Sequence, residues 1–378
     1  MRVSQITWNK SAGWQSANVD PDSQLVYVFG GIDVLKDPQR YEELRKIFPS
    51  AEIVMGTTAG EITRDQVRDE SVVATGMHFS STQIRTCKVQ VADHEDSFTC
   101  GREITRNLSG PGLKHIFIVS DGILVNGDEL IRGVNQELPA EVLITGGLAA
   151  DAGRFSGTLT GLNQAPVSGQ VVAVGFYGSS FMAGHGSRGG WDIFGPVRIV
   201  TRSSGNKLFE LDGTNALELY KKYLGDKAAE LPGAALLFPL CILSDDGSHL
   251  VRTILNIDES SGSMTFAGDI PQGARVQFMM ANFDRLIDGA FRAAEEGRLS
   301  LKNQTPDLVL MISCVGRKIV LDQRVEEEVE SVSEIFGSHP VYAGFYSNGE
   351  ISPLASSTAC SLHNQTMTIT TYQEIAQS

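Results

Sequence analysis

The chain has 378 residues, of which 42% are apolar and 20% charged, so we expect a globular protein of one large domain or two to three ordinary ones. Its net charge of −14 at pH 7 argues against binding to nucleic acid or to anionic membranes, because both are polyanions. Residues 1–14 contain no apolar signal core, and no apolar run approaches the roughly 18 residues of a spanning helix, so we expect a cytoplasmic protein without membrane insertion.

Three segments of the chain repeat one order of predicted elements. Short, continuous apolar runs are typical of strands covered on both faces, and apolar residues three and four apart predict helices. The first segment has strands at 24–32, 51–62 and 71–79 and a helix at 38–48. The second has helices at 97–108 and 127–138 and strands at 115–122, 141–151 and 169–178. The third has strands at 275–282, 307–317, 340–351 and 361–372 and helices at 283–297 and 324–336.

The segment between the second and third repeats has a different character. A helix is predicted at 215–225, and the runs 251–257 and 263–270 predict a hairpin. We place a boundary within 201–232, where a Pro/Gly break follows the helix. The sequence therefore predicts an α/β protein of repeated β-α-β units that form two related, tightly associated halves.

A Gly-Glu corner occurs twice, once near each end of the chain. Residues 54–62 read VMGTTAGEI and residues 343–351 read AGFYSNGEI. A corner of this kind at a strand end points a carboxylate toward the crevice where open α/β sheets bind ligands. Glu61 and Glu350 are therefore candidate ligand groups, and we expect the two corners to meet around one site. The alternative is a structural corner in which each carboxylate caps backbone N–H groups.

Other reactive side chains follow predicted strands of the third repeat. Arg317 ends the run Ser-Cys-Val-Gly-Arg and could grip a ligand carboxylate, or pair with Glu350 or Glu61. Cys314 stands where a nucleophile could stand, although a free cysteine is more often a small buried hydrophobe. The five cysteines are widely spaced without a CxxC pair, which predicts reduced, mostly buried thiols.

Two histidines adjoin predicted strand ends. His363 opens the last strand, where it could bond a carboxylate, titrate near neutrality or ligate iron, and a hydrogen-bonded structural histidine is the alternative. His185 lies in a glycine-rich stretch that contains a literal G-x-G-x-x-G. We reject a dinucleotide fingerprint there, because residues 191–200 read as a strand and the fingerprint needs a helix.

The ordered set of these motifs resembles the FIST protein family, an N-terminal FIST domain followed by a C-terminal one. The resemblance is carried by 56–61, 120–122, 146–151, 211–225, 313–317, 344–350 and 363–366. It implies a FIST N domain at 22–220 and a FIST C domain at 221–372. It also implies a sensory protein for small ligands, with amino acids among the proposed ligands, that signals to a partner such as a histidine kinase. A subset of the family is described as haem-based nitric oxide sensors.

We therefore predict a ligand-sensing protein without a catalytic residue, whose output passes to a separate signalling protein. A haem-dependent nitric oxide sensor and an enzyme that uses Cys314 or a carboxylate pair are the alternatives. The expected ligand is small and zwitterionic or carboxylate-bearing. The predicted ligand-binding residues are Thr57, Thr58, Glu61, Arg317, Ser347, Glu350, Asn364 and Thr366. His185 and His363 are the candidate axial ligands if haem is bound.

Overall fold

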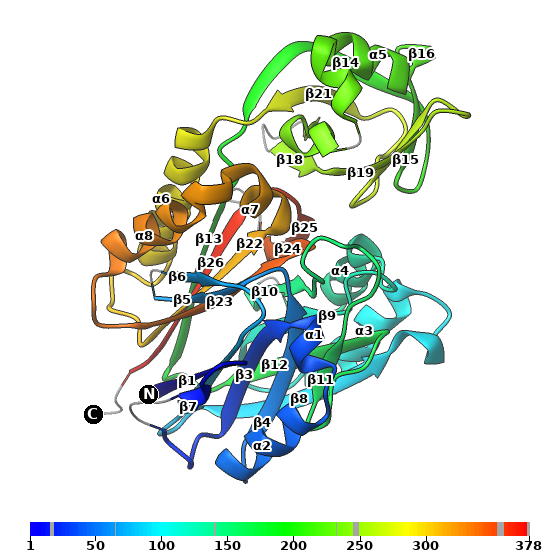
Figure 1. The fold of residues 1–378 in the computed structure, drawn as a ribbon. Helices are drawn as coiled ribbons and strands as arrows, with labels where there is room; N and C mark the ends of the chain where they lie inside the picture. The colour runs from blue at the N-terminus through cyan, green and yellow to red at the C-terminus, as the bar shows by residue number, and fades with distance from the viewer. Residues whose placement is uncertain are drawn as a thin grey trace.

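The computed structural model describes residues 1–15, 19–64, 66–139, 141–231, 233–244, 249–353 and 359–375. It confirms a mixed α/β protein built from β-α-β units (Figure 1). Three six-stranded sheets make up a body, and an eight-stranded sheet makes up a small domain that lies above the body in Figure 1. Among the described residues, no helix is both long enough and apolar enough to cross a membrane.

The first sheet has the order β11-β4-β3-β7-β1-β2. Its strands are β1 (Arg2–Asn9), β2 (Gly13–Gln15), β3 (Leu25–Gly31), β4 (Glu52–Thr58), β7 (Val72–His78) and β11 (Thr160–Leu162). Helices α1 (Ile32–Leu35) and α2 (Gln39–Ile47) connect the parallel pair β3 and β4. The predicted helix at 38–48 is thus confirmed, whereas the predicted strand at 51–62 breaks after Thr58.

The second sheet has the order β25-β24-β10-β9-β12-β8. Its strands are β8 (Gln83–Gln90), β9 (Leu113–Ser120), β10 (Leu143–Leu148), β12 (Gln170–Tyr177), β24 (Gly349–Pro353) and β25 (Cys360–His363). The predicted helices are confirmed as α3 (Ser97–Leu108) and α4 (Gly127–Asn135), and a short 3-10 turn, η1 (Val91–Asp93), precedes α3. Helix α4 connects the parallel pair β9 and β10.

The third sheet has the order β13-β26-β22-β23-β5-β6. Its strands are β5 (Glu61–Thr63), β6 (Gln66–Arg68), β13 (Phe181–Arg188), β22 (Leu308–Cys314), β23 (Val341–Ser347) and β26 (Met367–Glu374). Its helices are α6 (Phe283–Ser300), α7 (Val315–Leu321) and α8 (Val325–Phe336), with the turn η4 (Asp322–Arg324) before α8. The predicted strand at 307–317 therefore ends at Cys314, and Arg317 lies on helix α7 rather than at a strand end.

The three repeats exchange strands in a cycle. The first repeat sends β5 to pair with β23 of the third, the third sends β24 to pair with β10 of the second, and the second sends β11 to pair with β4 of the first. Each exchanged strand runs antiparallel to its new neighbour and lies next to a parallel pair. No repeat therefore completes its own sheet, which explains why the two parts of the chain are tightly associated.

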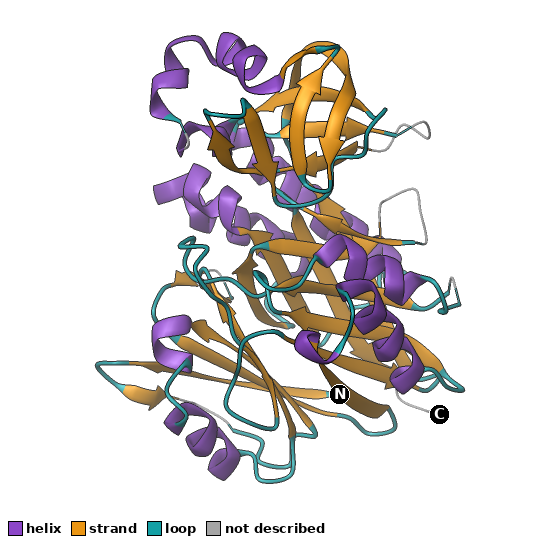
Figure 2. Ribbon diagram, turned by 90° about the vertical axis from the view of Figure 1, so that its right-hand side faces the viewer, coloured by secondary structure: helices purple, strands orange, loops and turns teal. Residues whose placement is uncertain are grey.

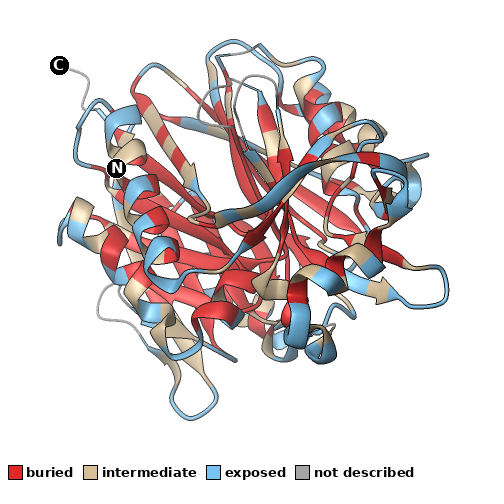
Figure 3. Ribbon diagram, turned by 90° about the horizontal axis from the view of Figure 1, so that it is seen from above, coloured by how far each residue is buried: buried red, intermediate tan, exposed pale blue. Residues whose placement is uncertain are grey.

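An apolar core lies between the three sheets. Figure 3 shows that the strands at the centre of the body are largely buried. The rings of Phe29 and Phe345, from the first and third sheets, have centroids 4.4 Å apart. Those of Tyr27 and Phe117, from the first and second sheets, have centroids 4.7 Å apart. Continuous apolar runs in the sequence thus correspond to strands with both faces buried.

The small domain, residues 191–282, is an insertion between β13 and α6 of the third sheet (Figure 2). Its strands are β14 (Asp192–Ser204), β15 (Lys207–Leu211), β16 (Thr214–Asn215), β17 (Leu240–Leu243), β18 (His249–Arg252), β19 (Ile254–Asp258), β20 (Ser263–Phe266) and β21 (Arg275–Met280). It also contains α5 (Ala216–Leu224) and the 3-10 turns η2 (Gly225–Glu230) and η3 (Gly233–Leu237). The predicted hairpin is confirmed as β19 and β20, and the division at 220/221 falls inside α5.

Candidate functional site

The Gly-Glu corners of the first and third repeats meet, and an equivalent corner of the second repeat joins them. Ala59 of the first corner donates its N–H to the Tyr346 carbonyl oxygen at 2.9 Å. Ala150 of the second corner donates to Thr57 O at 2.8 Å, and Asn348 of the third donates to Leu148 O at 3.2 Å. The three corners thus form a closed ring of backbone hydrogen bonds at the carboxyl ends of the parallel strands.

Both corner glutamates are fully buried and bonded within their own repeats. Glu61 accepts from the Thr58 hydroxyl at 2.5 Å and from the Ser71 hydroxyl at 2.6 Å. Ser71 immediately precedes β7, so the carboxylate ties the corner to the last strand of its repeat. Burial raises the pKa of Glu61 to about 7, against the opposing effect of these hydrogen bonds.

Glu350 reproduces this arrangement in the third repeat. It accepts from the Ser347 hydroxyl at 2.7 Å and from the Thr366 hydroxyl and N–H at 2.9 and 3.1 Å, just before β26. Burial raises its pKa to about 8. These are the contacts of the structural alternative, in which each carboxylate accepts hydrogen bonds from neighbouring groups of the protein. Thr57 is likewise buried, and its hydroxyl accepts the Leu159 N–H at 3.0 Å.

The sequence reasoning missed the third corner acid, Asp151. It is buried and accepts the N–H groups of Phe155, Ser156 and Gly157 at 2.8, 2.7 and 3.1 Å. Burial alone would raise the pKa of Asp151, but these hydrogen bonds outweigh it and lower the pKa. The run Leu-Ala-Ala-Asp at the end of the predicted strand 141–151 was the available signal, since it places an acid three residues after the strand end as in the other corners.

Arg317 joins the two connections that lead into and out of the small domain. Its buried guanidinium pairs with the buried carboxylate of Glu328 at 2.7 Å. It also donates to the carbonyl oxygens of Gly189, before the small domain, and Leu286, after it. Glu328 accepts further hydrogen bonds from Ser313 and Tyr346. We call Arg317, Glu328 and the carbonyl oxygens of Gly189 and Leu286 the hinge clamp. Arg317 donates its hydrogen bonds within the hinge clamp and not to Glu350 or Glu61.

Cys314 and His363 are buried side chains, and the second candidate haem ligand, His185, is partly buried. Burial strongly raises the pKa of the Cys314 thiol, and the nearby Glu350 adds to this, which is opposite to what activates a nucleophile. His363 bonds the Ser352 carbonyl oxygen at 3.0 Å, and burial lowers its pKa to about 4. Burial also lowers the pKa of His185. Neither histidine lines any of the three clefts described below, and the assignment of an axial haem ligand stays a prediction.

A cleft of about 510 Å³ lies between the second repeat and the small domain, and we call it the interdomain cleft. The body supplies the loop after β9, the start of α4, the end of β10, Phe155 and Asn348. The small domain supplies the turn between β14 and β15, Leu255 and the segment Phe266–Asp269. This is the crevice outside the carboxyl ends of β9 and β10, which is where α/β sheets bind ligands.

Asn348 is the distinctive polar group of the interdomain cleft. It is 8% exposed, and neither the oxygen nor the nitrogen of its side-chain amide has a hydrogen-bond partner in the described part of the protein. The amides of Asn364 and Gln365, in the turn that faces this corner, are buried and unpartnered in the same way. Buried polar groups in folded proteins are almost always hydrogen-bonded, so this region has unused capacity for polar partners.

A second interdomain contact borders this cleft, and we call it the latch. Arg252 of β18 is buried and donates one guanidinium nitrogen to both carboxylate oxygens of Asp128, on α4, at 2.9 Å each. It also donates to Leu362 O at 3.0 Å, and Asp128 accepts the Asp269 N–H at 2.8 Å. The latch is therefore one of the contacts that hold the small domain to the body, together with the apolar packing of Trp191 and Met279 against Leu286.

The equivalent crevice of the first repeat, about 700 Å³, contains the predicted residues Thr58 and Glu61. Lys318 lies in it and donates to the Ala59 carbonyl oxygen and to Asp69. The second cation of this crevice, Arg154, pairs with Asp33 at 2.9 Å. Its cations are thus already bonded to protein groups.

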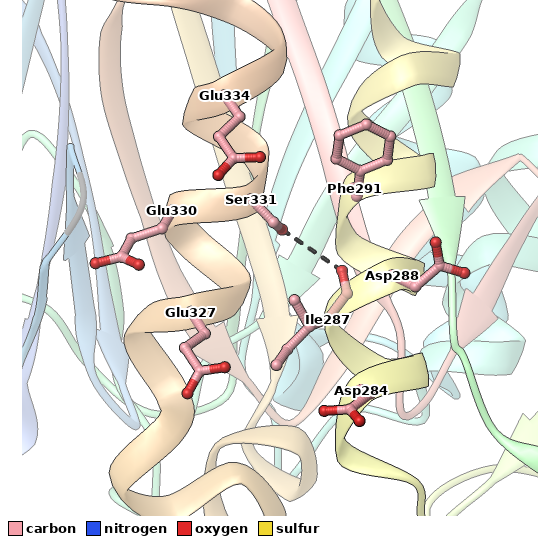
Figure 4. A pocket seen from close by; sticks show the side chains of 8 residues that line it. All are labelled: Asp284, Ile287, Asp288, Phe291, Glu327, Glu330, Ser331 and Glu334. Carbon is pink, nitrogen blue, oxygen red and sulfur yellow. Dashed lines mark hydrogen bonds between the residues drawn. The ribbon is translucent and has the colours of Figure 1, made fainter.

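A groove between α6 and α8 is lined mainly by carboxylates (Figure 4). Its lining comprises Asp284, Asp288, Glu327, Glu330, Glu334, Ser331, Ile287 and Phe291. Arg324 pairs with Asp284 and Glu327, and Arg292 pairs with Asp288. The groove is therefore a solvated helix surface whose acids are partly neutralised by neighbouring arginines.

Models of two known domain families match consecutive segments of the chain. The FIST N domain model matches residues 24–214, and the FIST C domain model matches residues 216–353. The chain belongs to the FIST family. FIST domains are associated with small-ligand sensing in signalling proteins, and the family is a sensory one. The two matches meet at the start of α5, and all three corners lie within them.

Two curated relatives are uncharacterised proteins from Mycobacterium tuberculosis, one from strain CDC 1551 / Oshkosh and one from strain ATCC 25618 / H37Rv. Each is 24% identical in an alignment of 242 residues that covers 60% of this chain. The match also spans 60% of the length of each relative.

Proposed function

We propose that this FIST protein is a small-ligand sensor, that its ligand binds in the interdomain cleft, and that the position of the small domain carries the signal to a separate signalling protein such as a histidine kinase. Amino acids are the first ligands to test, in keeping with the family resemblance. The observation that carries the proposal is a cleft shared by two domains that contains a buried, unpartnered amide.

The location of this cleft favours sensing. A ligand that touches both domains stabilises one of their relative positions by as much as its affinities for the two positions differ. The chain enters and leaves the small domain near Gly189 and Asn282, so a hinge motion at these two segments would move it as a unit. The ligand site predicted around Arg317 and Glu350 is less favourable, because the donors of Arg317 are directed to the hinge clamp.

The test combines a ligand screen with a distance measurement. Amino acids and small carboxylates are screened by thermal shift, and hits are added to protein that carries spin labels at Asn107→Cys on α3 and Glu259→Cys in the small domain, with Cys87 replaced by Ser. We expect hits to narrow or shift the distance distribution between the labels. Asp128→Asn, which weakens the latch, serves as a control that broadens it without ligand. Saturating ligands that leave the distribution unchanged would contradict signalling by the small domain.

A further inference from the structure

We propose that the interdomain cleft recognises a small molecule with a carboxylate head and an apolar body, the head lying between the start of α4 and the amide of Asn348. This inference rests on the proposed function and names the chemical class of its ligand. Two independent features of the cleft carry it, one polar and one apolar.

The polar feature is the meeting of a helix N-terminus with an unpartnered amide. At the start of α4, Asn126 accepts the N–H groups of Glu129 and Leu130. The N–H groups of Gly127 and Asp128 have no protein acceptor within the described residues, and Gly127 lines the cleft. The free N–H groups of a helix start favour an anion. The amide nitrogen of Asn348, which lines the same cleft, can donate to that anion as well.

Of the two acids near this place, Asp128 is neutralised and Asp269 is not. The carboxylate of Asp128, in the first turn of α4, is paired with Arg252 through both of its oxygens. Asp269 also lines the cleft, and no cation pairs with its carboxylate among the described residues. Asp269 can therefore face an ammonium group on the ligand, so leucine and its analogue without the amino group are separate arms of the test.

The apolar feature is a group of exposed side chains that converge on the cleft. These are Ile123, Leu124, Phe155 and Leu255, which are 38%, 58%, 38% and 38% exposed. They come from both domains, and large apolar side chains that gather in one concave place mark binding sites. Phe155 is held there in a left-handed backbone conformation (φ +51°), with its N–H bonded to the corner acid Asp151. An apolar ligand body would cover these side chains.

The probes are 4-methylpentanoate, its uncharged amide 4-methylpentanamide, and leucine, each titrated by calorimetry. Acid and amide share their apolar body and differ in the head. We expect the amide to bind at least about tenfold more weakly than the acid, and Asn348→Ala to weaken the acid by about fivefold to tenfold. Tighter binding of leucine than of the acid, lost in Asp269→Asn, would assign the ammonium contact to Asp269.

A matched pair of variants locates the site. Leu124→Glu puts a negative charge at the cleft, and Leu299→Glu puts one at a leucine of similar exposure (60% against 58%) outside it. We expect Leu124→Glu to abolish binding of the acid and Leu299→Glu to leave it unchanged. Equal affinity for acid and amide, both sensitive to Leu124→Glu, would overturn the carboxylate head and leave the sensor proposal intact. The carboxylate head is overturned in the same way if neither probe binds but other screened compounds bind in a Leu124→Glu-sensitive manner. Binding that is insensitive to Leu124→Glu in every case would overturn both.

Discussion

Removal of the buried cation from the hinge clamp should destabilise the protein strongly. In Arg317→Ala, the carboxylate of Glu328 stays buried with only the hydroxyls of Ser313 and Tyr346 as donors. Breaking a buried ion pair from one side costs about 3–5 kcal/mol, because the remaining charge is uncompensated. The carbonyl oxygens of Gly189 and Leu286 lose donors too, although such costs are not additive within one network.

The control for this change is Arg324→Ala. Arg324 ends η4, the turn that follows α7, and it pairs with Asp284 and Glu327. Because it is 40% exposed, its replacement should lower the free energy of unfolding by at most about 1 kcal/mol. Thermal unfolding of both variants and of Arg317→Met/Glu328→Gln measures the difference. The double variant should recover much of the lost stability, since it removes both charges. If Arg317→Ala melts within error of Arg324→Ala, the hinge clamp does not hold the two connections as we describe.

Three further predictions concern other buried groups. The pKa of Glu350 is raised to about 8 in the folded protein, so its carboxyl group stabilises the fold fully below the unfolded pKa near 4.5 and loses this contribution as the pH rises to about 8. The apparent Tm should therefore fall between these pH values, and it should fall less in Glu350→Gln. The same pH profile in the variant and the wild type would contradict this. Iodoacetamide should modify the half-buried Cys87 first and Cys314 of the native protein slowly, measured by mass spectrometry of the peptides. Rapid stoichiometric labelling of Cys314 would instead support the enzyme alternative. Arg252→Met should speed hydrogen exchange at the start of α4 and in the segment 266–269, while exchange in β22 stays slow; equal exchange in wild type and variant would mean that the latch does not hold the small domain.

The sequence by itself determined the local elements and the repeat. Continuous apolar runs located the parallel strands of all three repeats, and apolar spacing located α2, α3, α4, α6 and α8, because burial on both faces or on one stripe leaves a periodic trace in the residue order. The duplicated Gly-Glu corner also indicated that the chain ends share one region. The ring of corner hydrogen bonds confirms that the corners meet.

Tertiary structure decided which groups are still available for a ligand. Arg317, Glu61 and Glu350 carry the charges expected of a binding site, yet the fold directs their hydrogen bonds to protein partners. The interdomain cleft, by contrast, joins residues more than a hundred positions apart, and its amide, Asn348, lies in the corner motif in which the sequence drew attention to Glu350 instead. Residue type reveals what a side chain can bond, but only the packing of the three exchanged sheets and the inserted small domain determines which of those bonds remain unmade.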